Sequence, residues 1–226
     1  MPAVACGALA LACALAIGSN AAARQPDGFW QGSFRSWAAE DKKDTPPKGA
    51  IVFVGSSSIR LWPIARSFPV LPARNRGLGG AQIDDVNHFV EPLVLKYEPK
   101  VVVFYAGEND IGAGAAPERI LDEYRSFVGL VHAKLPSTRI VFISIKPSPV
   151  LQARWSRAKE ANRRVEQFCA TDKRLRYVDV ATSMLGPNAK PRGELFTDDG
   201  LHMNASGYRL WTRILTPVVE SAFAEP

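Results

Sequence analysis

The sequence predicts an α/β fold, with a central parallel sheet of about five strands between two layers of helices. Short apolar runs rich in β-branched residues recur along the chain, and segments with a helical spacing of apolar residues lie between them. Strands that are apolar throughout are typical of parallel sheets covered on both faces. In such a fold, helices alternate with the strands along the chain and connect one parallel strand to the next.

Three strands are clear in the sequence and two are weaker. The clear strands are residues 50–54, 101–105 and 140–145, and the weaker ones are residues 70–75 and 176–180. Each clear run is too short for a buried helix and stands next to turn-forming residues. Five such strands connected through helices favour a flavodoxin-like three-layer α/β/α sandwich.

Helical patterns occupy the segments around the strands. In one of them, Pro117 stands at a first helical position, and Ile120, Tyr124 and Val131 follow on one stripe. The predicted helices are residues 30–43, 57–66, 83–95, 117–135, 155–170 and 204–223.

The composition suits one sizeable domain. The chain has 226 residues, of which 46% are hydrophobic, and a formal net charge of +6. Its basic residues are dispersed, and the cluster at residues 154–164 contains Glu160, which indicates a solvated helix face. We therefore expect no nucleic-acid partner and at most peripheral contact with an anionic membrane or polysaccharide.

The first 23 residues resemble a secretory signal peptide. They contain no charged side chain, have an Ala/Leu-rich centre and end in the small residues 21–23. The sequence thus predicts an exported protein, periplasmic or secreted. A retained membrane anchor, or lipidation at Cys13, is the less favoured alternative.

Behind this leader we expect an N-terminal helix and linker over residues 24–49 and a single domain over residues 50–226. Cys6 and Cys13 belong to the leader, so Cys169 would be the one cysteine of the mature chain. It cannot form an intramolecular disulfide, and we expect it to be a small buried side chain.

Polar residues follow the strands at the edge where parallel sheets bind ligands. A helix should start in the run Gly55-Ser-Ser-Ser58, whose serines could cap that helix or expose a nucleophilic hydroxyl. Gly79 and Gly80, after the second strand, could form a turn or leave the backbone bare so that an amide can reach a substrate. Asn109, after another strand, could form an Asx turn or donate its amide to an oxyanion.

Asp199 and His202 precede the C-terminal helix and would reach the same edge. A carboxylate beside an imidazole fixes its tautomer and stabilises its protonated form, as hydrolases require, although such a pair is often only a turn. His88 and His132 lie in helical patterns and are expected to be structural or surface residues. The sequence shows no compact His/Cys ligand cluster, so we expect neither a metal nor another cofactor.

Together these motifs resemble the SGNH hydrolases of the GDSL esterase/lipase superfamily. The resemblance runs from Ile51 to the C-terminal helix and is carried by FVGSSSI (53–59), NRGLGG (75–80), YAGEND (105–110) and DDGLH (198–202). It implies that Ser57 is the nucleophile, His202 the general base and Asp199 its orienting acid. The N–H groups of Ser57 and Gly80 and the Asn109 amide would form the oxyanion hole. Ser56 replaces the family's usual aspartate, and it and Ser58 would cap the helix or support the site.

The implied activity is hydrolysis of an ester through an acyl-enzyme intermediate. Small or short-chain acyl esters, O-acetyl groups of glycans and lysophospholipids are the candidate substrates. Trp62, Lys146 and residues 147–149 are candidate pocket-wall residues because of their position. The alternative is a non-catalytic module on the same fold that binds a carbohydrate or a phosphate-bearing ligand at this edge.

Overall fold

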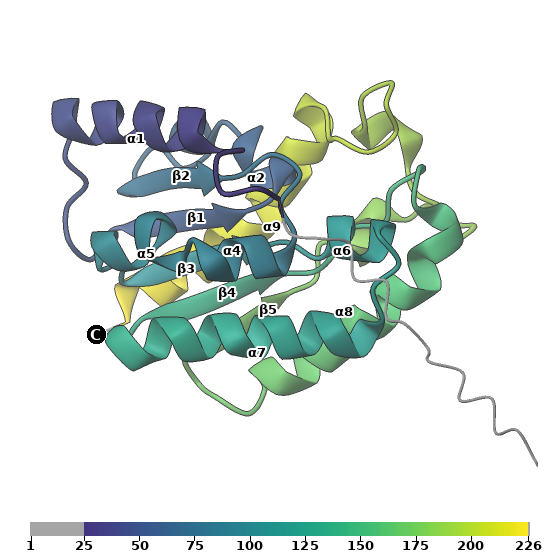
Figure 1. The fold of residues 1–226 in the computed structure, drawn as a ribbon. Helices are drawn as coiled ribbons and strands as arrows, with labels where there is room; N and C mark the ends of the chain where they lie inside the picture. The colour runs from purple at the N-terminus through teal and green to yellow at the C-terminus, as the bar shows by residue number, and fades with distance from the viewer. Residues whose placement is uncertain (1–24, 226) are drawn as a thin grey trace, which may run out of the picture.

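The computed structural model describes residues 25–225, and the predicted leader with Cys6 and Cys13 lies outside them. The predicted three-layer sandwich is confirmed: helices cover both faces of a five-stranded parallel sheet of order β2-β1-β3-β4-β5 (Figure 1). The strands are β1 (Ile51–Gly55), β2 (Ala73–Gly77), β3 (Val101–Tyr105), β4 (Arg139–Ile143) and β5 (Leu175–Val178). The two segments with the weaker pattern, residues 70–75 and 176–180, correspond to β2 and β5, and β2 begins three residues later than expected.

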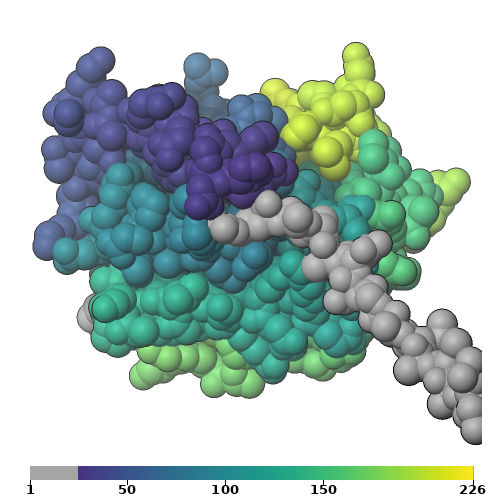
Figure 2. Space-filling view, in the orientation of Figure 1, coloured from purple at the N-terminus to yellow at the C-terminus, as the bar shows by residue number. Residues whose placement is uncertain are grey.

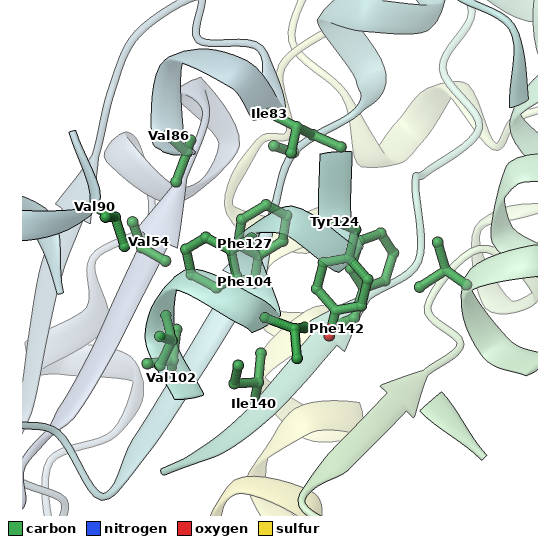
Figure 3. Close-up of a cluster of buried hydrophobic side chains, with 14 of the residues drawn as sticks. Val54, Ile83, Val86, Val90, Val102, Phe104, Tyr124, Phe127, Ile140 and Phe142 are labelled. Atoms are coloured by element: carbon green, nitrogen blue, oxygen red, sulfur yellow. The ribbon is translucent and has the colours of Figure 1, made fainter. Parts of the chain in front are cut away.

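The two faces of the sheet carry separate apolar cores. One core lies beneath α4 (Ile83–His88), α5 (Val90–Leu93), α7 (Pro117–Lys134) and α8 (Trp155–Cys169), where Phe104, Phe127 and Phe142 pack together (Figure 3). The other lies beneath α2 (Ser57–Arg60), α3 (Ile64–Ser67) and α9 (Ala205–Ala224). Because both faces of the sheet are covered, every residue of the central strands β1 and β3 is buried, which explains why these strands are apolar throughout.

Two predicted helices are interrupted in the structure. The segment expected at residues 57–66 forms α2 and α3, separated at Pro63, because proline lacks the N–H that an uninterrupted helix requires. The segment 83–95 divides at Phe89, and the ring of Pro92 would clash with the His88 carbonyl in a continuous helix. Shorter elements complete the fold: α6 (Glu108–Gly112) and the 3-10 turns η1 (Leu95–Tyr97), η2 (Gln152–Arg154), η3 (Thr182–Met184) and η4 (Gly193–Leu195).

The helix α1 (Gln31–Lys43) packs along the β2 edge of the sheet (Figure 1). In the space-filling view, the purple residues at the start of the described chain lie directly against the rest of the domain (Figure 2). Trp30, just ahead of it, is only 3% exposed and belongs to the core. Arg76 on β2 is buried and pairs with Glu40 and Asp41 of α1. Its Nε also donates to the Tyr97 hydroxyl at 2.6 Å, and that hydroxyl donates to Asp41 at 2.7 Å, so several contacts hold α1 to the sheet.

Glycines allow three backbone segments to meet at the carboxyl ends of the strands. A Cβ on Gly55 would lie 1.8 Å from the Tyr105 carbonyl oxygen, and the φ of Gly55 is +139°. A Cβ on Gly77 would lie 2.2 Å from the backbone nitrogen of Arg60. The ends of β1 and β3 therefore touch through bare backbone, as do the end of β2 and the end of α2, which fixes their relative positions.

We predict that Gly55→Ala lowers the free energy of unfolding by at least about 2 kcal/mol, because it adds a steric overlap to a backbone conformation that disfavours side chains. Urea unfolding followed by circular dichroism measures the change. Gly129→Ala is the matched control. Gly129 is exposed within α7 and has no atom within 4 Å of an added Cβ, so alanine there should stabilise by about 0.5–1 kcal/mol. Equal stability of the two variants would contradict this account of Gly55.

Candidate active site

Ser57 stands at the junction between β1 and α2. After Gly55, the Ser56 N–H donates to the Tyr105 carbonyl at 2.9 Å, and Ser57 is the first residue of the helix. Ser56 occupies the N-cap position, yet its side chain makes no capping hydrogen bond. The capping expected of Ser56 is therefore not observed, and Ser58 lies within the helix. Both side chains are buried, so Ser57 is the accessible serine of the three.

Asp199 and His202 belong to one hydrogen-bonded turn ahead of α9. The Asp199 Oδ1 accepts the N–H groups of Leu201 and His202 at 2.8 and 2.9 Å, and also the Thr197 hydroxyl. Its Oδ2 lies 2.6 Å from Nδ1 of His202. The contact with the His202 ring is the main cause that lowers the pKa of Asp199, and the turn's N–H groups add to it, so this carboxyl remains ionised near neutral pH.

The turn is anchored to the rest of the protein through Asn204. The Asn204 side chain accepts the N–H groups of Ser206 and Gly207 and so caps α9. Its amide donates to the carbonyl groups of Glu194 and Phe196, at 2.9 Å each. The position of His202 is thereby tied to the start of the C-terminal helix.

The structure brings Ser57 and His202 together across 145 positions of sequence. The Oγ of Ser57 lies 3.0 Å from Nε2 of His202, on the opposite side of the ring from Asp199. A hydroxyl, an imidazole and a carboxylate thus form one continuous chain of hydrogen bonds. This geometry can transfer the serine proton to the histidine while the carboxylate stabilises the resulting positive charge.

Gly80 and Asn109 lie at the same pocket. Neither the Ser57 N–H nor the Gly80 N–H donates to an acceptor in the described part of the chain. The Asn109 amide donates one hydrogen bond to the Ala81 carbonyl at 2.8 Å, which orients it and leaves its second N–H for another acceptor. The φ of Gly80 is +76°, a conformation that glycine adopts without strain. Three donors are therefore available near Ser57, as an oxyanion hole would require.

The pocket has a volume of about 530 Å³ and contains all the candidate groups except Asp199. Its lining residues are Phe29, Trp30, Ser33, Ser57, Arg60, Gly79, Gly80, Asn109, Leu201 and His202. The prediction that Trp62 lines the pocket is wrong, because its side chain is 2% exposed and packs in the core under α9. Lys146 and Ser148 are also buried and do not line the pocket.

Sequence reasoning missed the actual wall residues. Phe29, Trp30 and Ser33 come from the segment expected to be a linker and helix ahead of the domain. Trp30 is oriented toward residues near Gly80, because its indole N–H donates to the Gly79 carbonyl at 3.0 Å. The aromatic pair Phe29-Trp30 was the available signal, since a soluble linker rarely carries two adjacent large aromatic residues.

A buried ion pair supports the floor of the site. Lys146, after β4, pairs with Glu108 of α6, and the Tyr105 hydroxyl also donates to Glu108 at 3.2 Å. The Lys146 side chain is fully buried, and burial lowers its pKa, although Glu108 opposes this shift. The next acidic residue of α6 is Asp110, which accepts the Ile83 N–H. Burial, with the charge of Glu123, raises the pKa of Asp110 to about 7.

The remaining histidines and Cys169 lie elsewhere. His88 contacts Asp27 on the surface, and the His132 ring lies 2.9 Å from the Thr138 carbonyl. Cys169 is buried, and burial raises the pKa of its thiol to about 12, as suits a small apolar side chain. It borders a larger hollow of about 770 Å³ at the opposite ends of β4 and β5, away from Ser57.

Two kinds of feature are absent from residues 25–225. No helix among them has the length and apolarity to cross a membrane. In the same part of the chain, no three His, Cys, Asp or Glu side chains are grouped so that they could hold a metal ion.

Sequence comparison identifies the family. The GDSL-like lipase/acylhydrolase family matches residues 62–210, about two thirds of the chain. The chain belongs to this family. The match includes Gly80, Asn109, Asp199 and His202 and begins just after Ser57. The resemblance to the SGNH hydrolases is thereby confirmed, and the protein is an ester hydrolase. No curated protein sequence matches the chain.

Solved structures share the fold of this GDSL-like protein. A Streptococcus pneumonia protein named for platelet activating factor is 20% identical, with a TM-score of 0.73 over 84% of this chain and 92% of its own. A Bacteroides fragilis protein named as an acylhydrolase is 22% identical, with a TM-score of 0.73 over 84% and 96%. A Bacteroides thetaiotaomicron GDSL-like lipase is 20% identical, with a TM-score of 0.72 over 84% and 98%.

We predict that Lys146→Met lowers the free energy of unfolding by about 3–5 kcal/mol, because it leaves the Glu108 carboxylate buried without its counter-charge. The double variant Glu108→Gln/Lys146→Met removes both charges and should recover much of this loss. Chemical denaturation of the single and double variants measures the difference. A double variant that is less stable than Lys146→Met would show that the ion pair does not account for the effect.

Proposed function

We propose that this protein is a serine carboxylic ester hydrolase in which Ser57, His202 and Asp199 form the catalytic triad. The observation that carries the proposal is the chain of two hydrogen bonds, 3.0 Å from Ser57 to His202 and 2.6 Å from His202 to Asp199. A non-catalytic binding module on this fold has no need for a serine, an imidazole and an ionised carboxylate in that order.

Catalysis would begin with transfer of the Ser57 proton to Nε2 of His202. The Ser57 oxygen attacks the ester carbonyl carbon and forms a tetrahedral intermediate, while Asp199 stabilises the protonated ring. The carbon–oxygen bond to the alcohol then breaks, and His202 gives its proton to the departing alkoxide. Water, deprotonated by His202, attacks the acyl-enzyme, and Ser57 regains a proton as the acid leaves.

The negative charge of each tetrahedral intermediate would be stabilised by three donors, namely the N–H groups of Ser57 and Gly80 and the Asn109 amide. The backbone donors stand on segments whose relative positions are fixed by the contacts of Gly55 and Gly77. The side-chain donor is held by its hydrogen bond to Ala81. Donors fixed in this way need not reorganise when charge develops, which is the main advantage of an oxyanion hole.

The pocket supports small or short-chain acyl esters as substrates. Its volume is about 530 Å³, and it is walled by Phe29, Trp30 and Leu201 beside Ser57. Proteins with the same fold are named as a GDSL-like lipase and an acylhydrolase. A carboxylesterase, an O-acetylesterase or a lysophospholipase-like enzyme fits this space, and the apolar leader sequence supports action outside the cytoplasm.

We expect Ser57→Ala to lower kcat on p-nitrophenyl acetate by at least about 10⁴-fold, since no other group would supply the nucleophile. A fluorophosphonate probe should label the wild-type protein at Ser57, located by fragment mass spectrometry, and should not label the variant. Ser126→Ala, on the exposed face of α7, is the matched control and should behave as wild type. Labelling at Ser56 or Ser58, or turnover by Ser57→Ala, would refute the assignment.

Asn109→Ala should reduce kcat by about 10²–10³-fold with little change in KM, because the amide would act chiefly on charge that develops in the transition state. Steady-state kinetics with p-nitrophenyl acetate separates the two parameters. A rise in KM alone would mean that Asn109 binds the ground-state substrate instead.

A further inference from the structure

Arg60 shares the pocket with the proposed nucleophile. It lies three residues after Ser57 on α2, and residues with this spacing occupy the same face of a helix. Both residues line the pocket, and the Arg60 side chain is exposed. A cationic group therefore stands one helical turn from the atom that would attack the ester.

The backbone that carries Arg60 is held firmly. The Asn75 amide of β2 donates to the Ile59 carbonyl at 2.6 Å and to the Trp62 carbonyl at 3.0 Å, on either side of Arg60. The bare backbone of Gly77 lies directly against the Arg60 nitrogen. The side chain thus extends from a fixed point, which lowers the entropy lost when it binds a ligand.

The guanidinium lies close to the proposed oxyanion hole. A Cβ on Gly79 would be 3.0 Å from Nε of Arg60, so the absence of a side chain at Gly79 leaves room for the arginine. Gly80, with its free N–H, is the next residue. A ligand group bound to Arg60 would consequently lie near an ester carbonyl seated at Ser57.

Arg60 has no partner for its charge within the described residues. Arg74 and Arg76 of the adjacent strand β2 each pair with a carboxylate, whereas Arg60 has neither a hydrogen bond nor an ion pair there. No Asp or Glu lines the pocket. The nearby Asp199 is already occupied by the His202 ring, two N–H groups and the Thr197 hydroxyl.

We propose that Arg60 binds an anionic group of the substrate, so that the preferred substrates are esters bearing a carboxylate or a phosphate close to the scissile bond. The planar guanidinium can donate two parallel hydrogen bonds to either group. Phe29 and Leu201 would contact the apolar part of the same molecule. This inference rests on the proposed esterase function and narrows its substrate class.

The test compares each anionic ester with a neutral partner. One pair is p-nitrophenyl hemisuccinate and its methyl ester, which place the carboxylate on the acyl side. The other is 1-acetylglycerol 3-phosphate and 1-acetylglycerol, which place the phosphate on the alcohol side and are followed by acid release. We expect the wild-type ratio of kcat/KM, anionic over neutral, to exceed 1 for at least one pair and to fall as salt concentration rises.

Arg60→Gln should lower that ratio by about 10–100-fold, the amount that loss of charge-assisted hydrogen bonds produces, and Arg60→Lys should restore part of it. Arg66→Gln is the matched control. Arg66 also lies on a short helix without an ion pair in the described chain, but outside the pocket, so removing its charge should leave the ratio near wild type. Matching melting temperatures would show that the variants are folded.

The outcomes separate the two proposals. Neutral esters hydrolysed in a Ser57-dependent manner, with a ratio that Arg60→Gln does not change, would overturn the role of Arg60 and leave the esterase function standing. An equal fall of the ratio in Arg66→Gln would also overturn it, because the effect would then come from net charge. No hydrolysis of any ester and no fluorophosphonate label on Ser57 would overturn both.

Discussion

The close approach of β1 to β3 at Gly55 is the constraint on which the site depends. The absence of a side chain at Gly55 lets its backbone rest against the Tyr105 carbonyl, and the following N–H, from Ser56, donates to that same carbonyl. The chain can therefore leave the strand and begin α2 within two residues, which puts Ser57 at the helix start. Since β1 and β3 are neighbours in the sheet, Asn109 after β3 faces the same crevice.

A second constraint is the buried ion pair beneath the site. The Glu108–Lys146 pair joins α6 to the segment after β4, and Tyr105, which supports the Ser56 turn, also donates to Glu108. Loops at the end of a sheet are normally its most mobile part. Here they share a buried ion pair, which fixes the loops relative to one another.

The sequence anticipates the features that depend on local pattern. Apolar runs mark the strands, and the polar residues after them mark the site, because parallel topology brings all carboxyl ends to one edge. Features that depend on contacts between distant segments escaped prediction. Trp62 lies five residues after Ser57, yet its large apolar surface places it beneath α9. The role of the segment before residue 50 depends on Arg76, whose burial against α1 no periodicity reveals.

The attachment of α1 through Arg76 has a consequence for the pocket. The candidate reacting groups come from the ends of β1 and β3 and from the turn before α9, whereas Phe29, Trp30 and Ser33 of the pocket wall come from the first turn of α1 and the two residues before it. Trp30 is tied to the Gly79 carbonyl beside Gly80 and packs in the core, whereas Phe29 and Ser33 are more exposed. The pocket lining can therefore be altered at two positions that the hydrogen bonds from Ser57 to Asp199 do not use, which separates recognition of a substrate from the chemistry performed on it.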